Sequence, residues 1–114
     1  MIAGIGLDLV CTERVARLSP AAVARIFTHA ERVHAAGRAE TLAGIFAAKE
    51  ALTKACGAGL LSVLRETEIQ YSDAGSPRIA VSDNLAKRLG AVRFFVSITH
   101  DAGIAAAVVV AEIE

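Results

Sequence analysis

The stretch from Gly44 to Gly57 constrains the fold of this chain most strongly. It is rich in alanine, leucine, lysine and glutamate, all of which favour helices. Phe46, Glu50 and Lys54 recur at intervals of four residues, so they stand on one side of the predicted helix. A glutamate and a lysine inside a nearly apolar run have two explanations. They form a surface ion pair one helical turn apart, or they belong to a site that needs both charges.

The rest of the chain alternates between strand and helix patterns, and several helices begin after a capping residue. The pattern predicts an α+β fold in which an antiparallel sheet packs against helices, with residues 1–114 forming one domain. The segment Leu60–Leu64 is either a loop or a helical turn. The predicted strands are Ile2–Val10, Glu68–Tyr71, Arg78–Val81, Val92–Thr99 and Ile104–Ile113. The predicted helix caps are Thr12, Ser19, Thr28, Thr41 and Ser82.

Composition limits the class of protein. Apolar residues make up 54% of the chain and aromatic residues only 4%, so the core has to consist mainly of alanine, valine, leucine and isoleucine. The net charge of zero gives no general argument for binding nucleic acid. No apolar run is long enough to span a membrane, and we expect no secretory signal at Met1–Gly4. Cys11 and Cys56 lack a CxxC spacing, which favours a cytoplasmic protein with reduced thiols.

Asp8 lies inside the first predicted strand, on the same face as Gly4 and Gly6. Aspartate is uncommon in strands, and glycines inside a strand suggest a bulge or a close approach of another backbone. The strand is either an edge strand with a hydrated aspartate or one that positions a carboxylate for function. His100 is similarly open to two explanations, because a histidine at a strand end is either structural or part of a site.

Positive charge gathers near the first helices. Residues 11–38 contain five arginines and two glutamates. Arginine suits contacts with carboxylates and phosphates, so this segment is either a docking surface or simply a hydrated helix face.

Three stretches together resemble the motifs of 4′-phosphopantetheinyl transferases. They are Gly-Ile-Gly-Leu-Asp-Leu-Val at 4–10, Phe-Ala-Ala-Lys-Glu-Ala-Leu-Thr-Lys-Ala at 46–55 and Ser-Ile-Thr-His-Asp at 97–101. They occur in the same order over nearly the whole chain. The short length is similar to that of the holo-acyl-carrier-protein synthase branch of this family.

The resemblance implies transfer of phosphopantetheine from coenzyme A to a serine of acyl carrier protein, with release of 3′,5′-ADP. This reaction serves fatty acid biosynthesis and lipid metabolism. The resemblance further implies that Asp8 and Glu50 bind Mg²⁺, with Mn²⁺ as an alternative, because Mg²⁺ prefers carboxylate and phosphate oxygens. Glu50 would take the proton of the serine, and Lys54 would reach the pyrophosphate and stabilise the leaving phosphate.

The resemblance also implies which residues bind the substrates. Arg14, Arg17 and Arg25 would dock the acidic carrier protein. Ile45 stands where the family commonly has an arginine, so Lys49 or an arginine of a neighbouring subunit would have to replace that contact. The coenzyme A contacts expected in this chain are Lys49, Lys54, Gly57, Ser97 and His100.

The last predicted strand shows no alternation between apolar and polar residues. Both of its faces should therefore be covered, either inside a monomer or by another copy of the chain. The family resemblance implies a homotrimer with active sites between subunits. Two other functions remain open: a metal-dependent phosphohydrolase acting on a pyrophosphate, and a non-catalytic module that binds carrier proteins.

Overall fold

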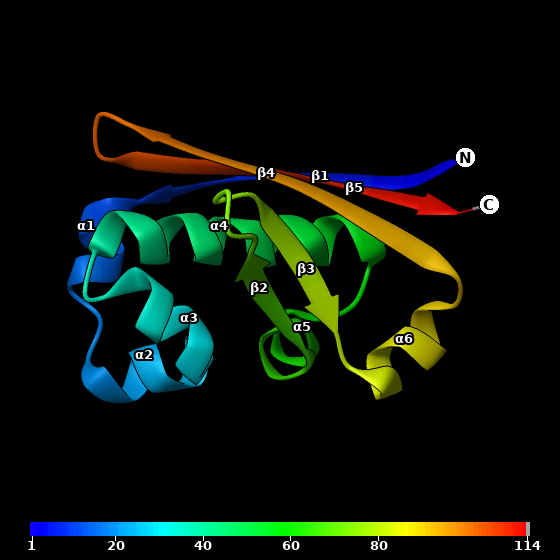
Figure 1. Ribbon diagram of the computed structural model, residues 1–114, viewed down its shortest axis with the longest axis horizontal. Coiled ribbons are helices and arrows are strands. Elements are labelled where there is room, and N and C mark those ends of the chain that lie inside the picture. Colours follow the sequence, from blue (N-terminus) through cyan, green and yellow to red (C-terminus); the bar gives the residue numbers. More distant parts are fainter. Residues whose placement is uncertain (114) are drawn as a thin grey trace.

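A three-stranded antiparallel sheet and one long helix form the centre of the molecule. The computed structural model describes residues 1–113. Strands β1 (Ile2–Cys11), β5 (Ile104–Ile113) and β4 (Val92–Asp101) lie in the order β1-β5-β4. Helix α4 (Ala39–Cys56) runs along one face of this sheet (Figure 1). The predicted α+β fold with an antiparallel sheet is confirmed.

Most of the remaining elements lie on the other side of α4, whereas α1 lies at its end beside β1, and β3 also contacts β4 (Figure 1). A separate two-stranded hairpin pairs β2 (Thr67–Tyr71) with β3 (Pro77–Val81). The short helices are α1 (Thr12–Ala16), α2 (Pro20–Ile26), α3 (His29–Ala35), α5 (Leu60–Glu66) and α6 (Asp83–Leu89). Helix α5 resolves the ambiguity at Leu60–Leu64. Within residues 1–113, none of the helices combines the length and hydrophobicity that a bilayer crossing requires.

Most of the predicted helix starts are confirmed. The side chain of Ser19 accepts a hydrogen bond from the Ala22 amide, and Ser82 caps α6 in the same way. Thr28 and Glu31 form the predicted capping box at the start of α3. Thr12 and Thr41 are not caps, because α1 begins at Thr12 itself, after Cys11 at the N-cap position, and α4 begins at Ala39, after Arg38 at the N-cap position. Helix α4 starts earlier because Ala39 and Glu40 are themselves good helix formers.

Helix α4 lies very close to β1 because two strand positions lack side chains. A Cβ atom on Gly4 would lie 2.0 Å from the carbonyl oxygen of Ala55, and one on Gly6 would lie 1.8 Å from that of Ala51. Both neighbours are backbone atoms of the helix, so they cannot swing aside. The predicted close approach of another backbone is therefore confirmed, and it fixes the distance between β1 and α4.

The sheet face away from α4 is apolar and largely uncovered. Ile5, Leu7 and Leu9 of β1 are 61%, 60% and 64% exposed, and Phe95 of β4 and Ile104 of β5 also face outward. In β5, Val109 is fully buried against α4, whereas the outward positions are only partly covered. The chain itself therefore covers only one face of β5. The expectation that the other face is also covered stays a prediction.

Candidate functional site

Asp8 projects from β1 towards α4 and is 12% exposed. Its Oδ1 atom accepts a hydrogen bond of 3.2 Å from the Lys54 Nζ atom. Lys54 also donates to the carbonyl oxygen of Leu7 at 2.9 Å, so the lysine is fixed at the edge of β1. The Asp8 Oδ2 atom is buried and, within the described chain, has no hydrogen-bond partner. A buried acceptor without a partner is costly, which makes it a candidate ligand atom.

Glu50 completes this group from the side of α4. Burial raises the pKa of Glu50 above its usual range, and the neighbouring Asp8 carboxylate raises it further, because two negative charges at close range repel each other. The positive charges of Arg14 and Lys54 act in the opposite direction. Lys54 forms its ion pair with Asp8 of another element, and the surface pair Glu50–Lys54 is absent from the ion pairs of residues 1–113. Glu50 and Lys54 of α4 therefore belong to the same site as Asp8 of β1.

The donor set fits a small divalent cation that also binds substrate phosphate. Two carboxylates lie together, and one carboxylate oxygen lacks a partner. Among the described residues, no group of three or more histidine, cysteine, aspartate or glutamate side chains could hold a metal ion. Mg²⁺ commonly binds one or two protein carboxylates and takes its other ligands from water and phosphate. Asp8 and Glu50 could hold such an ion.

The structure separates the two residues expected from the end of β4. Ser97 and His100 are three residues apart, so they point to opposite faces of the strand. Ser97 lies on the open face of the sheet, in a shallow hollow with Leu7 and Thr99. His100 lies on the α4 side, where its Nδ1 atom is 3.3 Å from Oε2 of Glu40. Within residues 1–113 they do not line a common cavity.

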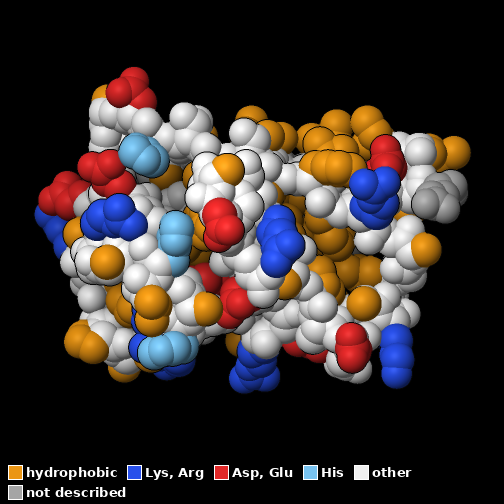
Figure 2. All heavy atoms as spheres, in the orientation of Figure 1, with side chains coloured by type: hydrophobic (Ala, Val, Ile, Leu, Met, Phe, Trp, Pro, Cys, Tyr) orange, Lys and Arg blue, Asp and Glu red, His pale blue; other side chains and the backbone are white. Residues whose placement is uncertain are grey.

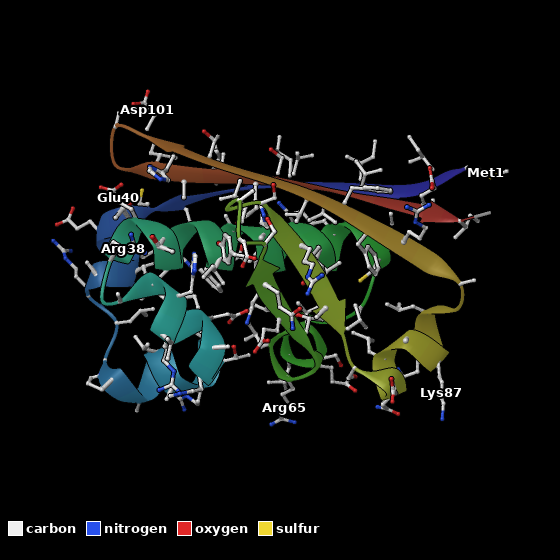
Figure 3. All side chains as sticks on the ribbon, in the orientation of Figure 1. Met1, Arg38, Glu40, Arg65, Lys87 and Asp101 are labelled. Carbon is white, nitrogen blue, oxygen red and sulfur yellow. The ribbon has the colours of Figure 1, made fainter. Side chains whose placement is uncertain are left out.

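A cavity of about 330 Å³ lies beside His100, between α3, α4, the β2–β3 hairpin and β4. The rings of His34 and Tyr71 stack in its wall, with centroids 3.8 Å apart and planes 10° from parallel. Figure 3 places Arg38 and Glu40 at the start of α4, below Asp101, the last residue of β4. Figure 2 shows histidine, basic and acidic side chains gathered over this end of the molecule. The lining residues are His34, Arg38, Glu40, Thr41, Gly44, Tyr71, Gly75, Pro77, Ile98 and His100.

Most of this cavity was not predicted from the sequence. His34, Arg38 and Tyr71 come from separate elements, and each carries no local signal of its own. Only His100 was expected here. A second hollow, of about 460 Å³, shares Arg38, Glu40, Thr41 and His100 with the first. The polar region therefore extends around the N-terminal end of α4.

The expectation that Lys49 contacts coenzyme A is wrong. Lys49 is fully buried, its Nζ atom lies 2.7 Å from Oε1 of Glu31, and it donates to the carbonyl oxygen of Ile26 at 3.0 Å. A ligand cannot reach this amine without displacing the core. Lys49 therefore does not replace the arginine that the family commonly has at position 45. In this chain that position is Ile45, whose side chain is buried.

Gly57 and the three arginines lie at accessible positions. Gly57 ends α4 with a φ of 75°, and its backbone is open because a Cβ atom there would meet nothing within 4 Å. Arg14, Arg17 and Arg25 are exposed on or beside α1 and α2. Arg14 is the one closest to the carboxylates, since its charge acts on Glu50 and its guanidinium lies 6.0 Å from the Phe46 ring. Arg17 is already paired with Glu13 at 2.6 Å.

Comparison with known proteins places these observations in a family. Residues 4–109 match the 4′-phosphopantetheinyl transferase superfamily. The chain is 41% identical to the holo-[acyl-carrier-protein] synthase of Salinispora arenicola, over 98% of this chain and 99% of that protein. It is 39% identical to the Streptomyces coelicolor synthase, over 97% and 98% of the two chains.

Solved structures show the same fold. The holo-[acyl-carrier-protein] synthase of Neisseria meningitidis superposes with a TM-score of 0.88 at 34% identity, covering 99% of this chain and all of that one. The Helicobacter pylori synthase, solved in complex with coenzyme A, superposes with a TM-score of 0.86 at 30% identity, covering 95% and 99%.

Proposed function

Because the chain belongs to the 4′-phosphopantetheinyl transferase superfamily, we propose that its carboxylate site performs the synthase reaction of its relatives. The protein is a holo-acyl-carrier-protein synthase. It transfers 4′-phosphopantetheine from coenzyme A to a serine of apo acyl carrier protein and releases 3′,5′-ADP. The observation that carries the site assignment is the meeting of Asp8, Glu50 and Lys54 from β1 and α4, with one carboxylate oxygen left unpartnered.

Asp8 and Glu50 would hold the metal ion, Mg²⁺ or Mn²⁺. Three features support this assignment: the orphaned Oδ2 of Asp8, the proximity of the two carboxylates, and the raised pKa of Glu50. When bound, the ion supplies charge neutralisation at the pyrophosphate. The two carboxylates repel each other in its absence, and a bound cation would relieve that repulsion.

Glu50 is suited to accept a proton. The serine oxygen of the carrier forms a bond to the phosphorus that carries pantetheine, and the bridging P–O bond of the pyrophosphate breaks. The serine proton passes to the Glu50 carboxylate, directly or through water. The electron pair of the broken bond stays with 3′,5′-ADP. A raised pKa makes Glu50 a stronger base than an ordinary glutamate, so it is a better proton acceptor near neutral pH.

Lys54 is positioned to stabilise the leaving group. Its ammonium group is 56% exposed and is held at β1 by Asp8 and by the Leu7 carbonyl oxygen. From there it can contact a pyrophosphate bound over the two carboxylates. Fixed positive charge that faces developing negative charge is a main source of catalysis in phosphoryl transfer.

The cavity beside His100 suits the nucleotide half of coenzyme A. Arg38, His34 and His100 supply cationic or hydrogen-bonding groups for phosphate, and Tyr71 and Pro77 supply apolar surface for the base. Gly57 lies at the other end of α4 and could contact the substrate through its open backbone. Ser97 faces a different surface, so in this proposal it contacts coenzyme A held by another subunit.

The proposed site is completed by a second copy of the chain. Asp8 lies on the β1 edge of the sheet and His100 on the β4 edge, with β5 between them. The strand next to Asp8 across the sheet is β5 at Ala107, and beyond it lies Ile98 of β4. Two strand spacings, about 10 Å, and the α4 helix separate the two halves. A neighbouring subunit that offers its β4 edge to this β1 edge would bring them together.

The open apolar face of the sheet supports such an assembly. Exposed leucine and isoleucine side chains on β1 adjoin Phe95 and Ile104, which is unusual for a surface facing water. A contact between unlike edges forms a closed ring when its rotation closes, and the trimer expected from the family is such a ring. Arg14, with Arg17 and Arg25, would then dock the acidic carrier protein next to Glu50.

Intact-mass spectrometry tests the proposal. Apo acyl carrier protein is incubated with coenzyme A, Mg²⁺ and the purified chain. We expect the carrier to gain one phosphopantetheinyl group and one equivalent of 3′,5′-ADP to appear. A phosphohydrolase would release 3′,5′-ADP without carrier, and a binding module would release none. Either result would overturn the proposal.

A further inference from the structure

A buried ion pair links helices that carry residues of the cavity wall. The side chains of Glu31 on α3 and Lys49 on α4 are both 0% exposed, and their charged atoms are 2.7 Å apart. The synthase chemistry described above uses neither residue. Lys49 also lies 6.0 Å from the centre of the Phe27 ring. A charge pair enclosed in an otherwise apolar core needs a specific explanation, because apolar residues of similar size often stabilise a core equally well.

The carboxylate of Glu31 joins three elements. Its Oε1 atom accepts hydrogen bonds from Lys49 Nζ on α4 and, at 2.9 Å, from the Thr28 amide at the start of α3. Its Oε2 atom accepts a hydrogen bond of 2.7 Å from the Ile69 amide on β2. The ammonium group of Lys49 adds the Ile26 carbonyl oxygen at the end of α2. Both carboxylate oxygens are therefore engaged, and each bond has a fixed direction.

The cavity wall is built on the residues next to these bonds. His34 lies three residues after Glu31, on the same side of α3. Tyr71 lies two residues after Ile69, on the same face of β2. The two rings stack on each other in the wall. The Glu31 carboxylate therefore anchors both elements that carry the stacked pair, close to where the pair forms.

We propose that Glu31 and Lys49 are positioning residues for nucleotide binding, because they hold α3 and β2 against α4 so that His34 and Tyr71 form the cavity wall. This inference rests on the proposed function of the cavity. Hydrogen bonds to a buried charge specify one alignment of the elements, whereas an apolar contact at the same place tolerates small shifts. The pair fixes the geometry of the wall, whereas Asp8 lies on β1 and Glu50 lies about 100° around α4 from Lys49.

The decisive variant is the double substitution Glu31→Met with Lys49→Met. It removes both charges together, so no unpaired charge remains buried, and the protein should fold. Glu31→Gln alone is the complementary single variant. Glu66→Gln is the matched control, because Glu66 also joins elements through its carboxylate but ties α5 to α6, where it accepts from Asn84 at 2.7 Å. Glu66 is not among the residues that line the cavity.

Affinity for 3′,5′-ADP is measured by calorimetry, and kcat and both KM values by the transfer assay. In the folded double variant we expect the Kd of 3′,5′-ADP and the KM of coenzyme A to rise about 10- to 100-fold, as when residues that orient a binding group are removed. The kcat and the carrier KM should stay within about twofold of wild type, and Glu66→Gln should change neither KM. A double variant with wild-type affinity for 3′,5′-ADP overturns the inference.

Amide hydrogen exchange separates this inference from the proposed function. If the wild-type protein fails to transfer phosphopantetheine, the proposed function fails, but the positioning of the wall can still be measured. Exchange in the β2–β3 hairpin should accelerate in the double variant and not in Glu66→Gln. Unchanged exchange in the hairpin overturns the positioning role even if the wild-type enzyme is active.

Discussion

Gly6→Ala tests how the sequence sets the geometry of the site. The new Cβ atom would lie 1.8 Å from the Ala51 carbonyl oxygen and 2.7 Å from its carbonyl carbon. A carbon and a carbonyl oxygen come no closer than about 3.3 Å in ordinary contact, so α4 and β1 have to separate by about 1.5 Å. Both contacts are with helix backbone, which makes a shift of the whole element the only relief.

The separation of β1 from α4 should impair catalysis, because the charged groups of the site are divided between these two elements. Asp8 is on β1, whereas Glu50 and Lys54 are on α4, so the Asp8–Lys54 contact of 3.2 Å would lengthen. A displacement of about 1 Å in a catalytic constellation can lower the rate about 100-fold. Overpacking of this kind also costs about 1–3 kcal/mol of stability. We expect a folded, less stable protein with kcat reduced about 100-fold.

The assay is the transfer reaction at saturating coenzyme A and carrier, together with thermal unfolding. Gly59→Ala is the matched control, because a Cβ atom on Gly59 would meet nothing within 4 Å. It should keep the wild-type rate. If folded Gly6→Ala turns over at the wild-type rate, the contact between β1 and α4 does not set the site, and the reasoning fails.

Four further predictions concern single residues. Glu50→Gln should raise the free energy of unfolding at pH 7 in the absence of metal. Because the pKa of Glu50 is raised in the folded protein, the stability of the wild type falls as the pH rises through that pKa. Equal stability of the two proteins at pH 7 would contradict this explanation. Arg14→Glu should raise the carrier KM and leave the coenzyme A KM unchanged, whereas equal effects on both would indicate misfolding. Val110→Asp should abolish assembly, as measured by light scattering, whereas Val109→Asp should prevent folding because Val109 is fully buried. An active oligomer of Val110→Asp would show that the open face of the sheet is not part of the interface. Lys49→Met should cost about 3–5 kcal/mol in denaturant unfolding because it leaves Glu31 charged and buried, and a loss below about 1 kcal/mol would argue against the ion pair.

Local patterns predicted most of the secondary structure, and they placed Asp8 and Glu50 on a strand and a helix that the structure brings together. The capping residues Ser19, Thr28 and Ser82 act through neighbours three residues away, which a sequence shows directly. The position of Asp8 followed from the strand period and that of Glu50 from the helix period. For the caps, the interaction that decides the structure lies within one turn of the helix.

Long-range contacts explain the errors. Lys49 was expected at a ligand because nothing in its own segment shows that Glu31, 18 residues earlier, is buried beside it. The cavity was missed because His34 and Tyr71 meet only after α3 and β2 pack together. The grouping of Ser97 with His100 is different, since the two-residue period of a strand already indicates opposite faces.

The stoichiometry of products in a single reaction tests the central claim most directly. Wild-type protein and Glu50→Gln are each incubated with coenzyme A, apo carrier protein and Mg²⁺, and holo carrier and 3′,5′-ADP are quantified together. We expect the wild-type protein to form both products in equal amounts and Glu50→Gln to form them at least about 100-fold more slowly, the lower range for loss of a general base. A folded Glu50→Gln protein with the wild-type rate, or 3′,5′-ADP formed without holo carrier, would contradict the assignment of the carboxylate site to phosphopantetheine transfer.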